Sequence, residues 1–211
     1  RQRQMCIRDS ENAVGRVIAR PFAGAPGSFY RTAGRHDFSL EPPGRTLLDA
    51  VAEAGMQVTG IGKIGDIFAN RSLTVSHPTK SNDDGVERLL SCMEQDFTGL
   101  CFLNLVDFDM LYGHRNDVRG YAEALNRFDA QFPSILERLQ KDDLLLLTAD
   151  HGCDPSTPST DHSREYVPLL LLGDGVRDGA SLGIFEGFDC VAATVCAALG
   201  IPPVGAGKDL L

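Results

Sequence analysis

Three apolar runs of strand length constrain the fold of this chain more than any other feature. Leu100–Val106, Leu144–Thr148 and Val167–Leu172 consist almost entirely of apolar residues. A strand that is apolar on both faces is typical of a parallel sheet between two layers of helices. Because the runs alternate with segments of helical periodicity, we predict an α/β protein with a largely parallel sheet.

The segments between these runs predict the remaining elements. Gln57–Ile61 predicts a fourth strand, and we expect all four strands to lie in one sheet with helices on both faces. Asn82 is the expected N-cap of one helix. Helices are predicted at Arg45–Ala54, Asn82–Gln95, Asp117–Leu139 and Phe188–Leu199.

Acidic and imidazole side chains follow two of the apolar runs. Asp109 and His114 come after the first run, Asp150 and His151 come directly after the second, and a Pro/Ser/Thr-rich loop then returns His162. Ligands of open α/β sheets bind at the carboxyl ends of the strands. Imidazole and carboxylate together suit divalent transition metals. The alternative is turn and cap chemistry with surface histidines, but the two clusters should share one edge of the sheet, which favours a metal site.

Composition narrows the class of protein and of partner. The formal net charge of -9 argues against nucleic acid and anionic membranes as partners. No apolar run reaches the roughly 18 residues that span a bilayer, and the start does not resemble a signal peptide. The six cysteines form no CxxC pair, and most lie in apolar runs. We therefore expect reduced thiols in a cytoplasmic protein. Cys153 lies beside the predicted metal loop, where a packing role, a reactive thiol and a weak ligand are the alternatives.

The first 43 residues differ from the rest. Residues 1–11 match nothing that follows, and we expect them to be non-native or disordered. Residues 12–43 are predicted to form a small separate unit, and residues 44–211 the metal-binding core. The small unit carries several arginines, which suit phosphate oxygens, although composition alone slightly favours a solvated loop. Lys63, in the tight turn after Gln57–Ile61, is similarly a candidate for anion contact or an ordinary exposed lysine.

The order of these residues resembles a known superfamily. Asp109-x4-His114, then Asp150-His151-Gly152, then His162 is similar to the metal-binding order of the alkaline phosphatase superfamily. The flanking sequences resemble the phosphopentomutase family more specifically, at residues 15–22, 35–37, 104–109 and 160–169. The resemblance implies an alkaline-phosphatase-like α/β core, with the tail end of a small α+β cap domain in residues 12–43.

The resemblance also implies an activity. Phosphopentomutases interconvert ribose 1-phosphate and ribose 5-phosphate, and the deoxyribose equivalents, with two Mn²⁺ ions and a phosphorylated threonine. When the metal-binding motif of the family is matched to this sequence, three residues would hold one ion and two residues would hold the other. The first set is Asp109, His114 and His162, and the second is Asp150 and His151. Contacts to the sugar phosphate are expected from Arg16, Ile18 and Lys63.

Two parts of the family pattern have no counterpart here. The resemblance places the phospho-accepting Thr and a further Asp ligand upstream of Asn12, so no catalytic residue is identified in the chain. We expect the chain to behave as the C-terminal half of a phosphopentomutase, inactive alone. Cys153 stands where the family usually has Asn. The alternatives are a metal-dependent phosphohydrolase or phosphoglycerate mutase of the same superfamily, and a non-catalytic metal-binding remnant. The flanks near Arg16 and Asp37 favour the pentomutase.

Overall fold

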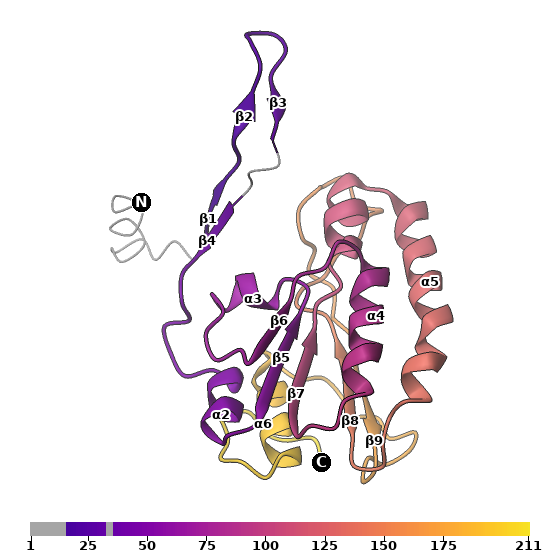
Figure 1. Cartoon of the computed structure of the whole chain (residues 1–211). Helices are drawn as coiled ribbons and strands as arrows, with labels where there is room; N and C mark the ends of the chain where they lie inside the picture. Colours follow the sequence, from indigo (N-terminus) through magenta and orange to yellow (C-terminus); the bar gives the residue numbers. More distant parts are fainter. Residues whose placement is uncertain (1–15, 33–35) are drawn as a thin grey trace.

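A three-stranded parallel sheet lies at the centre of the computed structural model, which describes residues 16–32 and 36–211 (Figure 1). Its order is β6-β5-β7, with β5 at Gln57–Ile61, β6 at Val75–His77 and β7 at Gly99–Leu103. β5 is paired on both edges and is its most buried strand, with Val58 and Ile61 both 0% exposed. The predicted non-native residues 1–11 lie outside the described residues.

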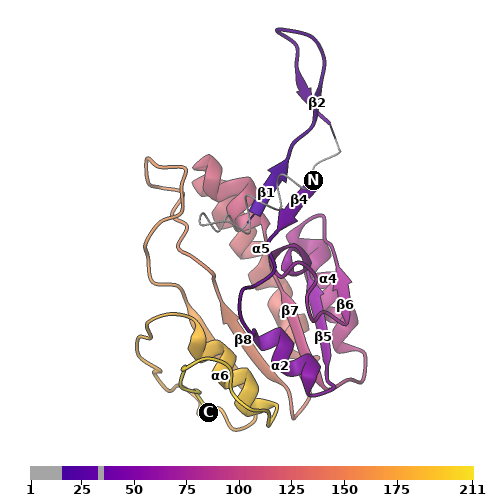
Figure 2. The same ribbon diagram turned by 90° about the vertical axis from the view of Figure 1, so that its left-hand side faces the viewer.

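Helices cover both faces of this sheet, which confirms the predicted α/β class (Figures 1 and 2). α4 and α5 contact each other on one face, and α2 and α6 contact each other on the other. A short helix, α3, follows β5. The bounds are α2 Leu47–Glu53, α3 Ile64–Ile67, α4 Asn82–Met93, α5 Val118–Leu136 and α6 Asp189–Ala198. Among the helices of the described residues, none has the length and apolarity to cross a membrane.

The helix starts follow from side-chain capping. Thr46 and Asp49 form a capping box at the start of α2, where the Thr46 hydroxyl accepts from the Asp49 amide and the carboxylate accepts from the Thr46 amide. Ser81, and not Asn82, caps α4, because its hydroxyl accepts from the amide of Asp84. The predicted N-cap was therefore wrong by one residue. The Asn82 side chain instead bonds to the backbone of Asp107.

The two later apolar runs do not join the parallel sheet. β8 (Leu144–Thr148) and β9 (Leu169–Gly173) pair with each other, antiparallel, as a separate two-stranded ladder. The prediction of one sheet for all four strands was wrong. β9 returns beside β8 after a loop that turns the chain back, and among the described strands none pairs with the other edge of β7 or of β8.

The N-terminal part is a long antiparallel ribbon that extends away from the sheets (Figure 1). β1 (Arg16–Ala19) pairs with β4 (His36–Ser39), and β2 (Phe22–Ala23) pairs with β3 (Tyr30–Arg31) further out. At its base, β4 contacts α3. The ribbon occupies most of the predicted cap remnant, but residues 12–15 lie outside the described part, and the boundary near residue 44 stays a prediction.

Candidate metal centre

Asp109 and His114 lie on two short helical segments directly after β7. Asp109 is on a π-helical turn at Phe108–Tyr112, and His114 is on a 3-10 turn at Gly113–Arg115. The start of this segment is held by Asp107, whose carboxylate accepts from the Asn82 amide at 2.7 Å while its own amide donates to the Asn82 side chain at 3.0 Å. This reciprocal pair fixes the exit of β7 to the N-terminus of α4.

His151 and His162 come from the loop between β8 and β9. Asp150 and His151 follow β8 directly. An isolated antiparallel bridge between Gly152 and Ser163 then brings the returning chain back beside the outgoing one. A Cβ at Gly152 would collide with the Ser163 carbonyl, so glycine is needed for this close approach. The bridge places His162 next to His151.

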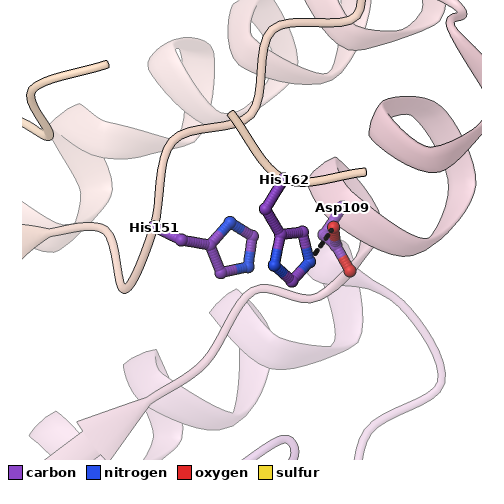
Figure 3. Close-up of side chains that lie close together, drawn as sticks. All are labelled: Asp109, His151 and His162. Carbon is purple, nitrogen blue, oxygen red and sulfur yellow. Dashed lines mark ion pairs between the residues drawn. The ribbon is translucent and has the colours of Figure 1, made fainter. Parts of the chain in front are cut away.

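Three ligand atoms from these two segments converge. One ligand atom each of Asp109, His151 and His162 lies within 4.8 Å of the others (Figure 3). Asp109 Oδ1 is 3.4 Å from His162 Nε2 and 3.3 Å from His114 Nε2. Ligand atoms bonded tetrahedrally to one ion at about 2.1 Å lie about 3.4 Å apart. The spacing of these atoms therefore fits a shared divalent ion.

The Asp109 carboxylate at the centre of this cluster has one oxygen without a hydrogen bond. Oδ1 of Asp109 is shielded from solvent and makes no hydrogen bond to the described residues. A buried carboxylate oxygen without a hydrogen bond is costly unless an ion or a charged group compensates it. Its neighbours are imidazoles, which ligate metals in their neutral form. The donor set is one that transition metals prefer.

The imidazoles are oriented by the protein backbone. Nδ1 of His114 lies 2.6 Å from the Thr160 carbonyl, and Nδ1 of His151 lies 3.0 Å from the Gly152 carbonyl. A carbonyl oxygen only accepts, so Nδ1 carries the proton in both rings. In the neutral rings Nε2 is then left with its lone pair available for a metal. The rings also stack, with the centroids of His151 and His162 3.6 Å apart.

Comparison with known proteins identifies the family. A model of the metalloenzyme superfamily matches residues 14–203, most of the chain. The chain belongs to the metalloenzyme superfamily. The expectation of a metal-dependent protein is thereby confirmed at the level of the superfamily, without the identity of the ion.

Curated relatives within this metalloenzyme superfamily are phosphopentomutases. The chain is 59% identical to the phosphopentomutase of Carboxydothermus hydrogenoformans over 94% of its length, 52% to that of Caldanaerobacter subterraneus over 97%, and 52% to that of Thermotoga maritima over 93%. The match covers 51%, 52% and 50% of those proteins, so the chain spans about half the length of the curated relatives it matches. The resemblance stated from the sequence is confirmed.

The remaining predicted site residues of this metalloenzyme lie further out. Asp150 Oδ1 is 3.6 Å from His151 Nε2, but its side chain is 73% exposed. Lys63 follows β5 at the N-terminus of α3, on the edge of the sheet from which Asp109 also emerges. Arg16 and Ile18 lie on β1 of the ribbon. Whether these residues contact substrate, and how the five predicted ligands divide between ions, stay predictions.

Two contacts that the sequence analysis missed hold the halves of the site together. The Asn116 side-chain amide donates to the carbonyls of Thr157 and Ser159 in the β8–β9 loop. Its backbone is left-handed, with φ of 53°, a conformation in which Asn is enriched. Gly113 lies so close to Cys153 that a Cβ there would collide with its Sγ. Only the Asn after the His-Arg pair offered a sequence signal, as a residue suited to a helix C-terminus.

Cys153 is partly buried and lies among carboxylates. Burial raises the pKa of its thiol, and the carboxylates of Asp109, Glu165 and Asp154 raise it further. A raised pKa reduces the thiolate that metal binding and nucleophilic attack require. Its contact with Gly113 supports the packing role among the alternatives left open by the sequence.

Proposed function

We propose that this chain is the metal-binding part of a phosphopentomutase, which interconverts (deoxy)ribose 1-phosphate and (deoxy)ribose 5-phosphate. The observation that carries the proposal is the identity of 49–59% to curated phosphopentomutases along nearly the whole chain. The cluster of Asp109, His151 and His162 supports it, because phosphoryl transfer depends mainly on positioning and on charge neutralisation. The relatives from Carboxydothermus, Caldanaerobacter and Thermotoga are all phosphopentomutases, which favours this activity over the phosphohydrolase and phosphoglycerate mutase alternatives.

The proposed cofactor is a pair of Mn²⁺ ions. Bound side by side, such ions would neutralise the phosphoryl oxygens and orient the attacking and leaving oxygens. Asp109 supplies a carboxylate oxygen, and the backbone bonds to Nδ1 of His114 and His151 keep their Nε2 atoms available.

The proposed substrate is a pentose phosphate held between the core and the ribbon. Lys63 and Arg16 provide cationic groups for its phosphate, and Ile18 an apolar contact for the sugar. Lys63 is half-buried, which favours a fixed position for its ammonium group. The five described cysteines are free thiols, which supports the further proposal of a reducing, cytoplasmic setting.

The phosphoryl carrier is proposed to be a threonine that the 211 residues do not contain at a matching position. The family resemblance places a further Asp ligand, like this threonine, upstream of Asn12. The chain by itself should then bind about one Mn²⁺ tightly and a second only weakly, because fewer ligands and less negative charge remain for that ion. Mutase turnover should be absent without the phosphorylated threonine.

A paired measurement tests this function. Mn²⁺ titration by calorimetry on the chain alone should give about one tight site, whose affinity falls in acid because protonated imidazole cannot ligate. A coupled assay with ribose 1-phosphate should show turnover only when the chain is co-produced with the part of the Carboxydothermus relative that it does not match. In that complex His162→Ala should abolish turnover, whereas the exposed Asp142→Ala should not.

Three outcomes would contradict the proposal. Two equally tight Mn²⁺ sites in the chain alone would refute the ligand assignment. Turnover by the chain alone would refute the assignment of the carrier. In the complex, preferential action on phosphoglycerate, or release of inorganic phosphate from a phosphomonoester, would assign one of the alternative activities instead.

A further inference from the structure

Arg71 joins the turn after α3 to the linker that leads out to the ribbon. Its Nη1 donates to the Pro42 carbonyl at 2.8 Å, and its Nε donates to the Asp49 carboxylate at 2.9 Å. Pro42 lies between β4 of the ribbon and α2 of the core, whereas Asp49 lies on α2 itself. Because the guanidinium group is a rigid planar fork, the two bonds together hold the linker at a fixed place beside α2.

The Asp49 end of this bridge is buried. Asp49 is 4% exposed, and its carboxylate also accepts hydrogen bonds from Thr46 and Ser72. Opening a buried ion pair would leave the carboxylate with less compensation for its charge, so the pair resists separation. The core therefore fixes the guanidinium group of Arg71, and the guanidinium group in turn fixes the Pro42 carbonyl.

The turn that carries Arg71 has an unusual backbone. Ala69, Asn70 and Ser72 all have a positive φ, of 53°, 58° and 60°. Residues other than Gly rarely adopt this left-handed conformation, and it persists only where the surrounding contacts over-determine it. The hydrogen bonds from Arg71 and Ser72 to Asp49 supply such contacts. The strained turn therefore favours a specific role for the position of Arg71.

The linker transmits this fixed position to the ribbon. Pro42 is followed by Pro43, and consecutive prolines form a stiff, extended spacer. Shortly before Pro42, Ser39 is the register partner of Arg16 on β1. A shift of the Pro42 carbonyl would therefore move the base of the ribbon, where Arg16 and Ile18 lie.

We propose that Arg71 is a positioning residue that fixes the direction of the ribbon relative to Lys63 on the core. Lys63 begins the short α3 segment, and the turn of Arg71 follows the same segment. One stretch of chain thus carries both the cation of the core and the bridge to the ribbon. The ribbon carries Arg16 and Ile18, the other candidate contacts to the sugar phosphate. Their role in holding substrate rests on the proposed function, whereas the fixed direction of the ribbon does not.

Two variants separate the bond to Pro42 from the bonds to Asp49. Arg71→Gln keeps an N–H donor at the position of Nε, where it can bond to Asp49, but it lacks the Nη1 that reaches Pro42. Ser72→Ala is the matched control, because it removes a different bond to Asp49 and leaves the Pro42 bond intact. Both variants retain the remaining bonds to Asp49, so both should fold, with a slightly lower urea midpoint.

The first measurement follows the ribbon in the full chain by pulsed electron paramagnetic resonance. Spin labels on noncanonical amino acids replace the exposed Ala25, in the outer turn of the ribbon, and the exposed Asp142 on the core. The unmodified chain and Ser72→Ala should give the same narrow distance distribution, and Arg71→Gln a shifted and broader one. A broad distribution in the unmodified chain, an unchanged one in Arg71→Gln, or an equal change in Ser72→Ala would overturn the proposal.

The second measurement separates positioning from chemistry. It uses the chain co-produced with the part of the Carboxydothermus relative that it does not match. Arg71→Gln should raise KM for ribose 1-phosphate about tenfold and keep kcat within about twofold, because a displaced ribbon weakens binding while the metal centre is untouched. Ser72→Ala should change neither constant.

The two measurements fail in different ways. A lower kcat at unchanged KM in Arg71→Gln would overturn the positioning role. If the unmodified complex shows no turnover, the proposed function fails, and the distances in the chain alone still decide whether Arg71 fixes the direction of the ribbon.

Discussion

β5 and β8 are both five residues long and β8 is the more apolar of the two, yet β5 lies in the more buried surroundings. β5 has a strand on each side, α2 packed against it and a contiguous core that includes Leu48, Val51 and Ile64. β8 has a single partner, β9, whose Leu170 is 53% exposed. An open cavity of about 940 Å³ lies between β9, the loop that follows it and the C-terminus. The burial of a strand in this protein therefore depends on the number of strands and helices that pack against it, and not on its apolar content alone.

The largest expected effect compares equivalent truncations in the two strands. Ile61→Ala on β5 removes a fully buried side chain and should destabilise the chain by about 4 kcal/mol, since the lost contacts and the cavity both count. Leu146→Ala on β8 removes as many carbons from a half-buried site and should cost about 1.5 kcal/mol. Urea denaturation of each variant gives the difference. Equal losses would show that β8 is as well packed as β5.

The second prediction concerns the hydrogen bonds around the buried carboxylate of Asp49, on helix α2 beside β5. Burial alone would raise the pKa of Asp49, but hydrogen bonds from Ser72, Thr46 and Arg71 outweigh it and lower the pKa to about 2, from 3.8. Because the folded-state pKa is depressed, the stabilisation is fully present above about pH 4 and is lost as the pH falls through about 2. The difference corresponds to about 2 kcal/mol.

Asp49→Asn should therefore lose about 2 kcal/mol at pH 7 and show a flatter pH dependence between pH 4 and pH 2. Asp142→Asn, at an exposed position, is the matched control and should change neither. Denaturation midpoints measured across this pH range decide the matter. An Asp49→Asn profile parallel to that of the unmodified chain would exclude Asp49 as the source of the acid sensitivity.

A third prediction concerns the contact that joins the two regions at the metal cluster. Gly113→Ala places a methyl group against Sγ of Cys153 and should push the β8–β9 loop away from the Asp109 segment. We expect Mn²⁺ affinity to fall about tenfold, as for other losses of supporting contacts around a metal. Adding Cys153→Ala should restore most of it, and Cys153→Ala alone should be nearly neutral. A large loss for Cys153→Ala alone would instead make the thiol a ligand.

The smallest expected effect concerns Asn116. Asn116→Gly removes its bonds to the Thr157 and Ser159 carbonyls but tolerates the left-handed backbone. Its Mn²⁺ affinity should fall about threefold with little change in stability. Asn116→Ala should show the same loss of affinity and a further loss of about 1 kcal/mol in stability. If both variants bind Mn²⁺ as the unmodified chain does, the loop is held by other contacts.

The sequence predicted what depends on a single segment and failed where distant segments decide. Leu144–Thr148 was placed correctly because an apolar run is a local signal, and Gln57–Ile61 because Gly55 and the turn at Gly62 bound it. The prediction that Gln57–Ile61 and Leu100–Val106 share a sheet was confirmed, but Leu144–Thr148 pairs only with β9, because strand pairing depends on segments far apart in the chain. The positions of Asp109 and His162 after apolar runs were enough to predict that both lie at one edge of the sheet. The bridge that sets His162 beside His151 is a tertiary contact without a local signature.

For polar residues too, contacts within one segment could be predicted and contacts between distant segments could not. The capping box at Thr46 has the expected pattern of Thr followed three residues later by an acidic residue. The bonds from Arg71 and Ser72 that bury the Asp49 carboxylate come from a loop more than twenty residues away, so no local pattern predicts them.

The location of the metal ligands has a consequence for the mechanical integrity of the molecule. Asp109 follows β7 of the parallel sheet, whereas His151 and His162 lie in the loop between β8 and β9, and no backbone ladder joins the sheet to the β8–β9 pair among the described strands. An ion held by all three residues would cross-link the parallel sheet to the β8–β9 ladder. Its binding energy would then add directly to the resistance of the protein to heat, with a melting temperature that climbs with the logarithm of the free ion concentration.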